Sequence, residues 1–278
     1  MENQTRLWDW FMKIGIIGKG FVGTAISKGF ESVGHETICH DVRLETSITD
    51  VLDTPITYIC VPTPSGDNGE CDTSIVYSVL RELYNLKYKG KVCVKSTVKP
   101  GSINKWRDEF YHNGEGLHIS FVPEFLREKC AEYDFKYNNN ILVIGTEDKE
   151  TERLVKECHG GLPTHTVVMK PIEGELMKYF SNSYKAMRVT FANAFYRICN
   201  EVDANYDVVK DAFLFHGVGD GHYLRVNKEF GGFGGTCLPK DTRGLAKLVE
   251  ELGLDIDLFK TIIRDNDKFA EQNDRFEI

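Results

Sequence analysis

The sequence predicts an α/β protein in which a doubly wound, Rossmann-like parallel sheet is followed by a smaller all-helical domain. From residue 13 to residue 169, short β-branched runs alternate with amphipathic stretches, a pattern typical of a parallel sheet covered by helices. A glycine-rich turn joins the first apolar run to the first amphipathic stretch. Beyond residue 170, apolar residues recur at helical spacing and no further strand-like run follows.

The sheet domain contains apolar runs of strand length. They predict strands at Lys13–Ile17, Glu36–His40, Ile56–Val61, Lys91–Lys95, Leu117–Phe121, Ile141–Gly145 and Thr164–Met169. Helical periodicity between these runs predicts helices at Phe21–Val33, Ser74–Leu86 and Lys149–Cys158. Because doubly wound sheets bind ligands at the carboxyl ends of their strands, functional residues are expected in the loops after these runs.

The helical domain begins with one long helix, predicted from Pro171 to about Glu201 because proline suits the first turn of a helix. Its three-or-four spacing predicts a buried apolar stripe made of Leu176, Phe180, Met187, Phe191, Ala194 and Ile198. Further helices are expected at Tyr206–Phe215, Lys240–Leu252 and Leu258–Gln272, with a glycine-rich loop at Gly231–Gly235. The predicted division is an N-terminal extension (1–12), the sheet domain (13–169) and the helical domain (170–278).

Composition excludes several classes of protein. The net charge is -8 and the 34 basic residues are spread along the chain, so no nucleic-acid partner is expected. No apolar run approaches the roughly 20 residues that cross a bilayer, and no signal sequence precedes the first strand, which favours a soluble protein of the cytoplasm. The eight cysteines form no CxxC pair, so no metal site is expected and a reducing compartment is favoured.

A dinucleotide-binding motif, Gly18-Lys19-Gly20-Phe21-Val22-Gly23, lies between the first predicted strand and its helix. The first glycine permits the tight turn, the second lets the backbone approach a pyrophosphate, and the third allows close helix packing. Asp41 ends the second strand 23 residues beyond Gly18, close to the roughly 20 expected for the carboxylate that binds the ribose hydroxyls. An acid there repels a 2′-phosphate and favours NAD over NADP, although Arg43 leaves this preference open.

Five further blocks share residue types and order with a known family. They are Val61-Pro62-Thr63-Pro64, Ser96-Thr97-Val98, Pro123-Glu124-Phe125-Leu126-Arg127-Glu128, Glu175-Leu176-Met177-Lys178-Tyr179-Phe180-Ser181-Asn182, and Gly232-Phe233-Gly234-Gly235-Thr236-Cys237-Leu238-Pro239-Lys240-Asp241. In these blocks the chain resembles the UDP-glucose/GDP-mannose dehydrogenase family, from about Lys13 to about Asp267.

The resemblance implies an NAD-dependent, four-electron oxidation of a nucleotide-sugar C6 alcohol to a carboxylate, with two NAD used in succession. Cys237 would be the nucleophile, since hydride transfer from a thiohemiacetal gives a thioester that water can open. The resemblance favours oxidation of UDP-glucose to UDP-glucuronate. GDP-mannose or a UDP-N-acetylhexosamine are alternative substrates, and an NAD-binding but inactive or split-enzyme subunit is the alternative of another class.

The resemblance also implies roles for individual side chains. Lys178 and Asn182 share one helix face and would hold the oxygen that becomes negative, together with a water. Asp241 would manage protons, Glu124 would assist thioester hydrolysis, and Thr97 would position water or cofactor. Lys240, three residues beyond Cys237, is a cation expected to favour the thiolate.

The expected binding residues fall into two sets. Those for NAD are Gly18, Gly20, Phe21, Val22, Gly23, Asp41, Val61, Pro62, Thr63, Ser96, Thr97, Glu128 and Lys240. Those for the sugar-nucleotide are Glu124, Phe125, Leu126, Arg127, Lys178, Asn182, Phe233 and Gly234. The resemblance implies a homodimer formed through the helical domain. Family members continue into a third, nucleotide-binding domain that we expect to be absent here. Its absence would weaken binding of the nucleotide or require a separate nucleotide-binding subunit.

Overall fold

The computed structural model describes residues 11–66, 69–138, 140–217, 221, 223–226 and 231–273. Most of the predicted N-terminal extension, residues 1–10, lies outside the described residues, and so does the side chain of Glu128. The chain divides into two compact units. One comprises Met1–Pro64 and Asp72–Lys178, and the other comprises Ser65–Cys71 and Tyr179–Ile278.

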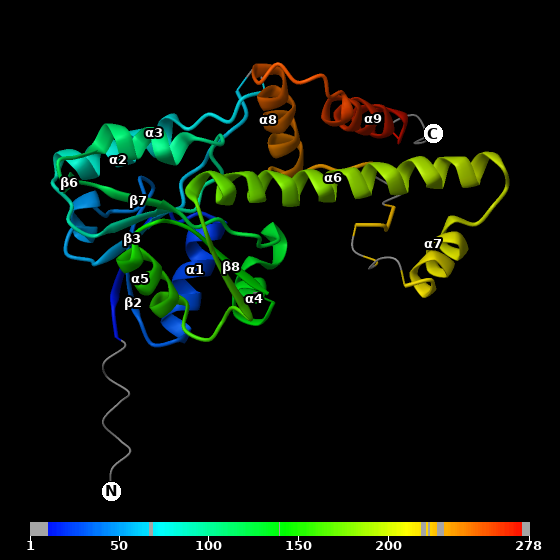
Figure 1. The fold of residues 1–278 in the computed structure, drawn as a ribbon. Helices are drawn as coiled ribbons and strands as arrows, with labels where there is room; N and C mark the ends of the chain where they lie inside the picture. The colour runs from blue at the N-terminus through cyan, green and yellow to red at the C-terminus, as the bar shows by residue number, and fades with distance from the viewer. Residues whose placement is uncertain are drawn as a thin grey trace, which may run out of the picture. The chain divides into compact units, whose positions relative to one another are not determined.

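The first unit is built on a seven-stranded sheet in the order β2-β1-β3-β4-β7-β8-β9 (Figure 1). The strands are β1 (Lys13–Ile17), β2 (Glu36–His40), β3 (Ile56–Ile59), β4 (Lys91–Val94), β7 (His118–Phe121), β8 (Ile141–Gly145) and β9 (His165–Met169). The predicted α/β fold is therefore confirmed. Of the neighbouring strands, β7 and β8 differ in that they pair antiparallel, through Phe121 and Gly145 at their carboxyl ends, whereas the other neighbours pair parallel.

Helices cover both faces of this sheet, as the strand residues dictate. Alternate side chains of a strand point to opposite faces. Ile14 and Ile16 pack in a core with α1 (Phe21–Ser32), α4 (Ala131–Tyr137) and α5 (Lys149–His159). Ile17 packs on the opposite face with α2 (Ser74–Asn85) and α3 (Ser102–Phe110). The short elements η1 (Ile48–Val51), η2 (Glu128–Cys130) and the hairpin of β5 (Tyr111–His112) and β6 (Glu115–Gly116) complete this unit.

The second unit is helical. The long helix α6 (Pro171–Glu201) begins in the first unit and ends in the second, which also holds α7 (Tyr206–Phe215), α8 (Leu238–Glu251) and α9 (Leu258–Asn273). One small core joins Ala186, Val189, Phe233 and Ile262, and another joins Ala192, Cys199, Tyr206 and Leu224. Within the described part of the chain, no helix is both long enough and apolar enough to cross a membrane.

The prediction of which face of α6 is buried is wrong. Of the predicted stripe, Leu176, Phe180, Phe191 and Ile198 are exposed by 43 to 73%. The buried face instead mixes polar, small and apolar residues, namely Glu175, Lys178, Tyr179, Asn182, Ser183, Ala186, Val189, Ala192, Asn193 and Cys199. Apolar spacing identifies the helix, but it does not say which of two faces meets the rest of the same chain. Here the polar face is buried because its side chains bind other segments, as described below.

Candidate functional site

The glycine turn between β1 and α1 has the shape that a pyrophosphate requires. Gly18 has a φ of 95°, and a Cβ on Gly23 would lie 1.9 Å from the carbonyl oxygen of Gly18. These two glycines are therefore needed by the turn itself. A Cβ on Gly20 would meet nothing within 4 Å, so Gly20 leaves open space beside the first turn of α1. Backbone N–H groups at a helix start bind phosphate oxygens, and the turn fits the predicted cofactor.

Asp41 follows β2 and its carboxylate is held beside the glycine turn. Oδ2 accepts a hydrogen bond from the backbone N–H of Lys19 at 2.6 Å, and Oδ1 accepts one from the backbone N–H of Arg43 at 2.9 Å. The guanidinium of Arg43 donates two more hydrogen bonds to it. Chiefly because of these Arg43 bonds, the pKa of Asp41 lies well below its ordinary value. A buried, ionised acceptor at this position fits a ribose diol.

Two other predicted cofactor segments meet where β3 and β4 end. The hydroxyl of Ser96 donates to the carbonyl oxygen of Val61 at 2.6 Å. Thr63 is buried in the same loop, while Pro62 is exposed and Thr97 is half-buried. Of the residues after the glycine turn, Phe21 is exposed and Val22 packs against the core.

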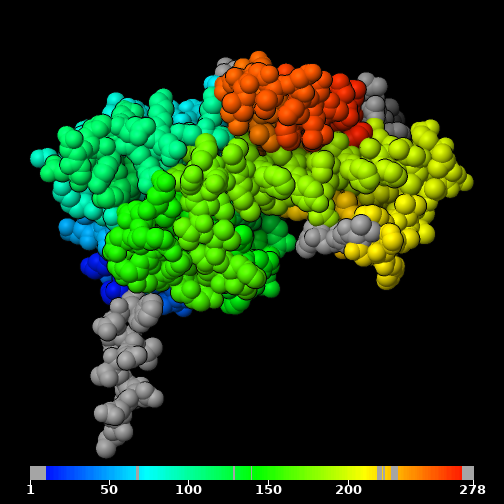
Figure 2. All heavy atoms as spheres, viewed as in Figure 1, coloured from blue at the N-terminus to red at the C-terminus, as the bar shows by residue number. Residues whose placement is uncertain are grey.

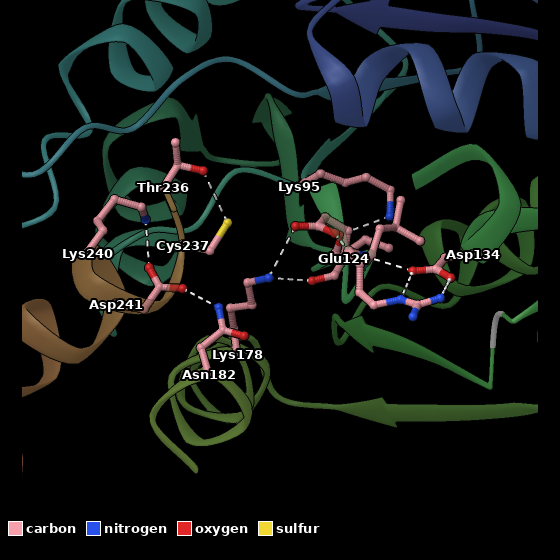
Figure 3. Close-up of polar contacts among 12 residues, drawn as sticks. Lys95, Glu124, Asp134, Lys178, Asn182, Thr236, Cys237, Lys240 and Asp241 are labelled. Atoms are coloured by element: carbon pink, nitrogen blue, oxygen red, sulfur yellow. Dashed lines mark hydrogen bonds and ion pairs between the residues drawn. The ribbon is translucent and has the colours of Figure 1, made fainter. Parts of the chain in front are cut away.

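Lys178 and Glu124 form a buried ion pair in the first unit (Figure 3). The ammonium of Lys178 donates to the carbonyl oxygen of Glu124 at 2.6 Å and lies 3.2 Å from its Oε1, while the side chains are only 4 and 9% exposed. The ring of Phe125 lies 5.5 Å from the same ammonium. Two residues predicted to take part in catalysis, 54 positions apart in the sequence, are thus in direct contact.

The segment after Glu124 is fixed by its own hydrogen bonds. The backbone N–H of Leu126 donates to Glu124 Oε2 at 2.6 Å, and that of Arg127 donates to Asp134 at 3.0 Å. The guanidinium of Arg127 also holds Asp134 through two hydrogen bonds. The backbone N–H groups of Leu126 and Arg127, two residues predicted to bind the sugar-nucleotide, are thus already engaged within the chain.

The second unit contains the predicted nucleophile. Cys237 is the residue before α8, its side chain is partly buried, and its Sγ lies 3.6 Å from the hydroxyl of Thr236 (Figure 3). Four residues on, Asp241 is buried on the first turn of α8 and accepts hydrogen bonds from Asn182 Nδ2 at 2.5 Å and Lys240 Nζ at 2.7 Å. Three predicted site residues, Asn182, Lys240 and Asp241, thus form one polar chain.

The structure changes the expected role of Lys240. Its ammonium pairs with Asp241 and approaches Sγ of Cys71 at 4.0 Å, rather than approaching Cys237. The reason is geometric, because the adjacent carboxylate of Asp241 is within reach of the Lys240 side chain. Lys240 is therefore paired with Asp241, and its support of the Cys237 thiolate stays a prediction.

The glycine loop before Cys237 is held by two asparagines that sequence analysis missed. Asn266 on α9 accepts from the N–H of Phe233 at 2.6 Å and donates to the carbonyl of the same residue at 3.1 Å. Asn193 on α6 accepts from the N–H of Gly232 at 3.1 Å. A Cβ on Gly232 would lie 2.4 Å from Asn266 Oδ1, so this glycine is required for the close approach. Gly234 is half-buried in the same loop.

Two buried ionisable residues of the first unit were also missed. Lys95 follows β4, is 4% exposed, and donates to the carbonyl oxygen of Val122 at 3.2 Å, and burial lowers its pKa. Glu175 is fully buried and accepts from the N–H groups of Gly101 and Ile103 at the start of α3. The available signal was a charged residue next to an apolar run for Lys95, and a position three residues before Lys178 for Glu175.

Comparison with known proteins matches both parts of the chain. Residues 42–162 match the NAD binding domain of the UDP-glucose/GDP-mannose dehydrogenase family, and residues 173–268 match the central domain of that family. The UDP-glucose 6-dehydrogenase of Rickettsia prowazekii is 30% identical, over 92% of this chain and 67% of that protein. The GDP-mannose 6-dehydrogenase of Pseudomonas aeruginosa is also 30% identical, over 92% of this chain and 68% of that protein.

A solved structure of the same family also resembles this chain. A UDP-glucose dehydrogenase from the archaeon Pyrobaculum islandicum superposes with a TM-score of 0.83 and 28% sequence identity, covering 93% of this chain and 68% of that one. The chain thus spans about two thirds of the length of the relatives it matches.

Proposed function

Because the chain belongs to the UDP-glucose/GDP-mannose dehydrogenase family, we propose that it oxidises the C6 alcohol of UDP-glucose to a carboxylate through a thioester on Cys237. It is an NAD-dependent oxidoreductase. The observation that carries the proposal is the position of Cys237 at the amino end of α8, beside a glycine loop tied down by Asn193 and Asn266. A helix start presents unpaired N–H groups to an anion, which favours a thiolate and its adducts.

The proposed reaction balances in three stages. The alcohol loses a hydride and a proton to give the aldehyde. The Cys237 thiol adds to the aldehyde, and loss of a second hydride and a proton from this adduct gives the thioester. Water then opens the thioester, which releases the carboxylate and restores the thiol. NAD, which the glycine turn and Asp41 would hold, would supply the oxidising power by taking up the two hydrides, one dinucleotide for each.

Two hydrogen-bond donors on α6 would stabilise the oxygen at C6. Lys178 and Asn182 lie four residues apart on α6 and so project from one face of the helix. Lys178 is a buried ammonium and Asn182 presents an amide fixed by Asp241. Preorganised donors of this kind stabilise a developing negative charge better than water does. We therefore assign both side chains to the oxygen that becomes an alkoxide.

Glu124 would assist the hydrolytic stage. Its carboxylate is held by the N–H of Leu126 and by Lys178, so its orientation is fixed before substrate binds. A carboxylate paired with an ammonium can accept a proton from attacking water, and the ammonium can then stabilise the charge on the thioester oxygen. Asp241, which is paired with Lys240 and accepts from Asn182, would help Lys178 and a bound water to manage protons.

The first experiment replaces the nucleophile. Cys237→Ser should lower carboxylate formation on the order of 10³-fold or more, because serine cannot form the thioester, while NAD binding stays unchanged. The matched control is Cys199→Ala, which removes a buried thiol of the same unit and should keep the activity. Carboxylate is measured by mass spectrometry and NAD binding by calorimetry. Retention of acid formation by Cys237→Ser would refute the thioester route.

A second arm traps the intermediate. Glu124→Gln should slow hydrolysis more than oxidation, so that a covalent substrate adduct accumulates on Cys237 and appears in the intact mass of the protein. Hydroxylamine should release it, as expected for a thioester. Glu150→Gln, which changes an exposed carboxylate of α5, serves as the control and should accumulate nothing. Absence of any adduct in Glu124→Gln, with acid formation as fast as before, would contradict the role of Glu124.

For the substrate, the proposal has a specific alternative. The two relatives described above act, by their names, on UDP-glucose and GDP-mannose, and they are equally similar to this chain. The turnover assay therefore includes both sugar-nucleotides and a UDP-N-acetylhexosamine. A higher kcat/KM for GDP-mannose would replace UDP-glucose as the substrate without affecting the thioester route.

We also propose that the chain forms a homodimer through α6. Exposed apolar residues lie on one side of this helix within the second unit, and the yellow-green atoms of α6 reach the surface in Figure 2. The α6 stripe consists of Phe180, Tyr184, Phe191, Phe195 and Ile198, which are 40 to 73% exposed. Contiguous exposed aromatic residues are typical of protein interfaces.

A location in the cytoplasm stays a prediction.

A further inference from the structure

The carboxylate of Asp41 has no acceptor position left over. A carboxylate offers about four lone-pair positions. Two are used by the backbone N–H groups of Lys19 and Arg43, and two by Nε and Nη2 of Arg43, at 2.8 and 2.9 Å. A ribose diol that donates to Asp41 must therefore replace hydrogen bonds that the protein already makes.

The bonds that give way must be those of the Arg43 side chain. The two backbone N–H groups are fixed by the glycine turn and by the chain after β2. The Asp41 side chain is 8% exposed, whereas the Arg43 side chain is 69% exposed and belongs to an exposed loop. The guanidinium is on the exposed side of this pair, so water can take over its hydrogen bonds when it leaves Asp41. Arg43 then remains beside the ribose, because it is only two residues from Asp41.

We propose that Arg43 is a cofactor-selecting residue that lets this chain bind NADP as well as NAD. With NAD, the ribose hydroxyls replace the guanidinium on Asp41. With NADP, the guanidinium stays next to Asp41, offsets its negative charge, and donates to the 2′-phosphate. An acid at the end of the second strand normally excludes a 2′-phosphate, and an arginine nearby accommodates it. This chain has both, two residues apart.

The other charged groups near Asp41 do not supply the positive charge that would meet the 2′-phosphate. The ammonium of Lys19 points to Ser27 and Cys39, to which it donates at 2.7 and 3.1 Å. His40 Nδ1 is paired with the hydroxyl of Thr46 at 3.2 Å. Arg43 is therefore the side chain whose removal should change the choice of dinucleotide. The inference concerns binding alone and stands apart from the thioester route.

The test compares the dissociation constants of NAD and NADP by calorimetry on the purified full chain. In the parent protein the two should lie within about tenfold of each other. In Arg43→Ala, NADP should bind at least about tenfold more weakly, because a 2′-phosphate would face an uncompensated Asp41, while NAD affinity should be unchanged or higher. Arg43→Lys keeps the charge but loses the bidentate geometry, and should lie between the two.

The control is Arg153→Ala, which removes another exposed guanidinium that is bidentate on a carboxylate of the same unit, Glu150. It should change neither dissociation constant. Thermal unfolding verifies that each variant is folded, and Arg43→Lys keeps the test open if Arg43→Ala is not. The proposal is overturned if the parent protein prefers NAD by more than tenfold, or if Arg43→Ala weakens both dinucleotides equally.

Discussion

Glu175 allows a sharp test of how burial controls an ionisable group in this fold. The carboxylate is fully buried on α6, and its two oxygens accept from the N–H groups of Gly101 and Ile103 at 2.5 and 2.9 Å. It thereby caps the amino end of α3. Burial raises its pKa from 4.5 to about 7, even though both hydrogen bonds act in the opposite direction. The desolvation of the charge therefore outweighs the capping bonds.

The sign of the effect on stability follows from proton linkage. Between pH 4.5 and pH 7 the folded chain holds a proton on Glu175 that the unfolded chain has released. This contribution to stability is complete below about pH 4.5 and is lost as the pH rises through about 7. A shift of this size corresponds to roughly 3 kcal/mol, most of which lies between pH 5 and pH 8.

The substitution Glu175→Gln separates the effect of the buried charge from the effect of the two hydrogen bonds that cap α3. The amide cannot ionise, so the variant should lose this pH dependence. Its single carbonyl oxygen can accept from only one of the two N–H groups, which costs about 1–3 kcal/mol. At pH 5 the variant should thus be less stable than the parent by about 1–3 kcal/mol. At pH 8 the removed charge offsets this loss, and the two proteins should be nearly equal.

The assay is urea unfolding of parent and variant at several pH values, followed by tryptophan fluorescence. Trp106 lies on α3, the capped helix, and is 4% exposed. Contributions of other titrating groups cancel in the difference between the two proteins. The control is Glu173→Gln, which changes an exposed carboxylate on the same helix that accepts from the N–H of Lys170, the residue before the helix. A difference between parent and Glu175→Gln that stays constant from pH 5 to pH 8 would refute the reasoning.

Two further predictions concern the glycine turn and the α6 stripe. Gly20→Ala meets no atom within 4 Å and should keep the melting temperature while lowering NAD affinity at least about tenfold by calorimetry. Gly23→Ala, with its Cβ 1.9 Å from Gly18, should instead lower stability by about 1–3 kcal/mol, and equal melting temperatures for both variants would contradict this. Phe191→Glu should convert dimer to monomer in analytical ultracentrifugation, whereas Phe215→Glu on α7, outside the stripe, should not. A monomeric parent protein would end the dimer proposal.

Local patterns in the sequence determined most of the first unit. Strand β1, the glycine turn and the start of α1 at Phe21 were all predicted, because the turn needs specific residues and the strand needs an uninterrupted β-branched run. The bounds of α6 were also predicted, since Pro171 suits a first turn and helical spacing persists to Glu201. The helices α3 and α4 were missed. They are nine and seven residues long, too short for a period of 3.6 to stand out.

The residues of the candidate site were likewise predicted only in part. Sequence alone predicted Cys237, Lys178, Glu124 and Asp241 as site residues, because each lies in a block of residue types that resembles a family. It could not identify Asn266, which holds the glycine loop from 33 residues away. Contacts of this kind leave no periodic trace in the sequence.

What the sequence by itself determined was the class of fold, the glycine turn, the long helix and the residue types of the chemistry, all of which depend on neighbours along the chain. Only the tertiary structure decided which face of α6 is buried, that Lys240 pairs with Asp241, and that the Asp41 carboxylate is saturated by Lys19 and Arg43. Each of these depends on which polar groups lose water and which partner replaces it. Hydrogen-bond partners and burial are set by distances in space, and residue spacing along the chain does not specify those distances.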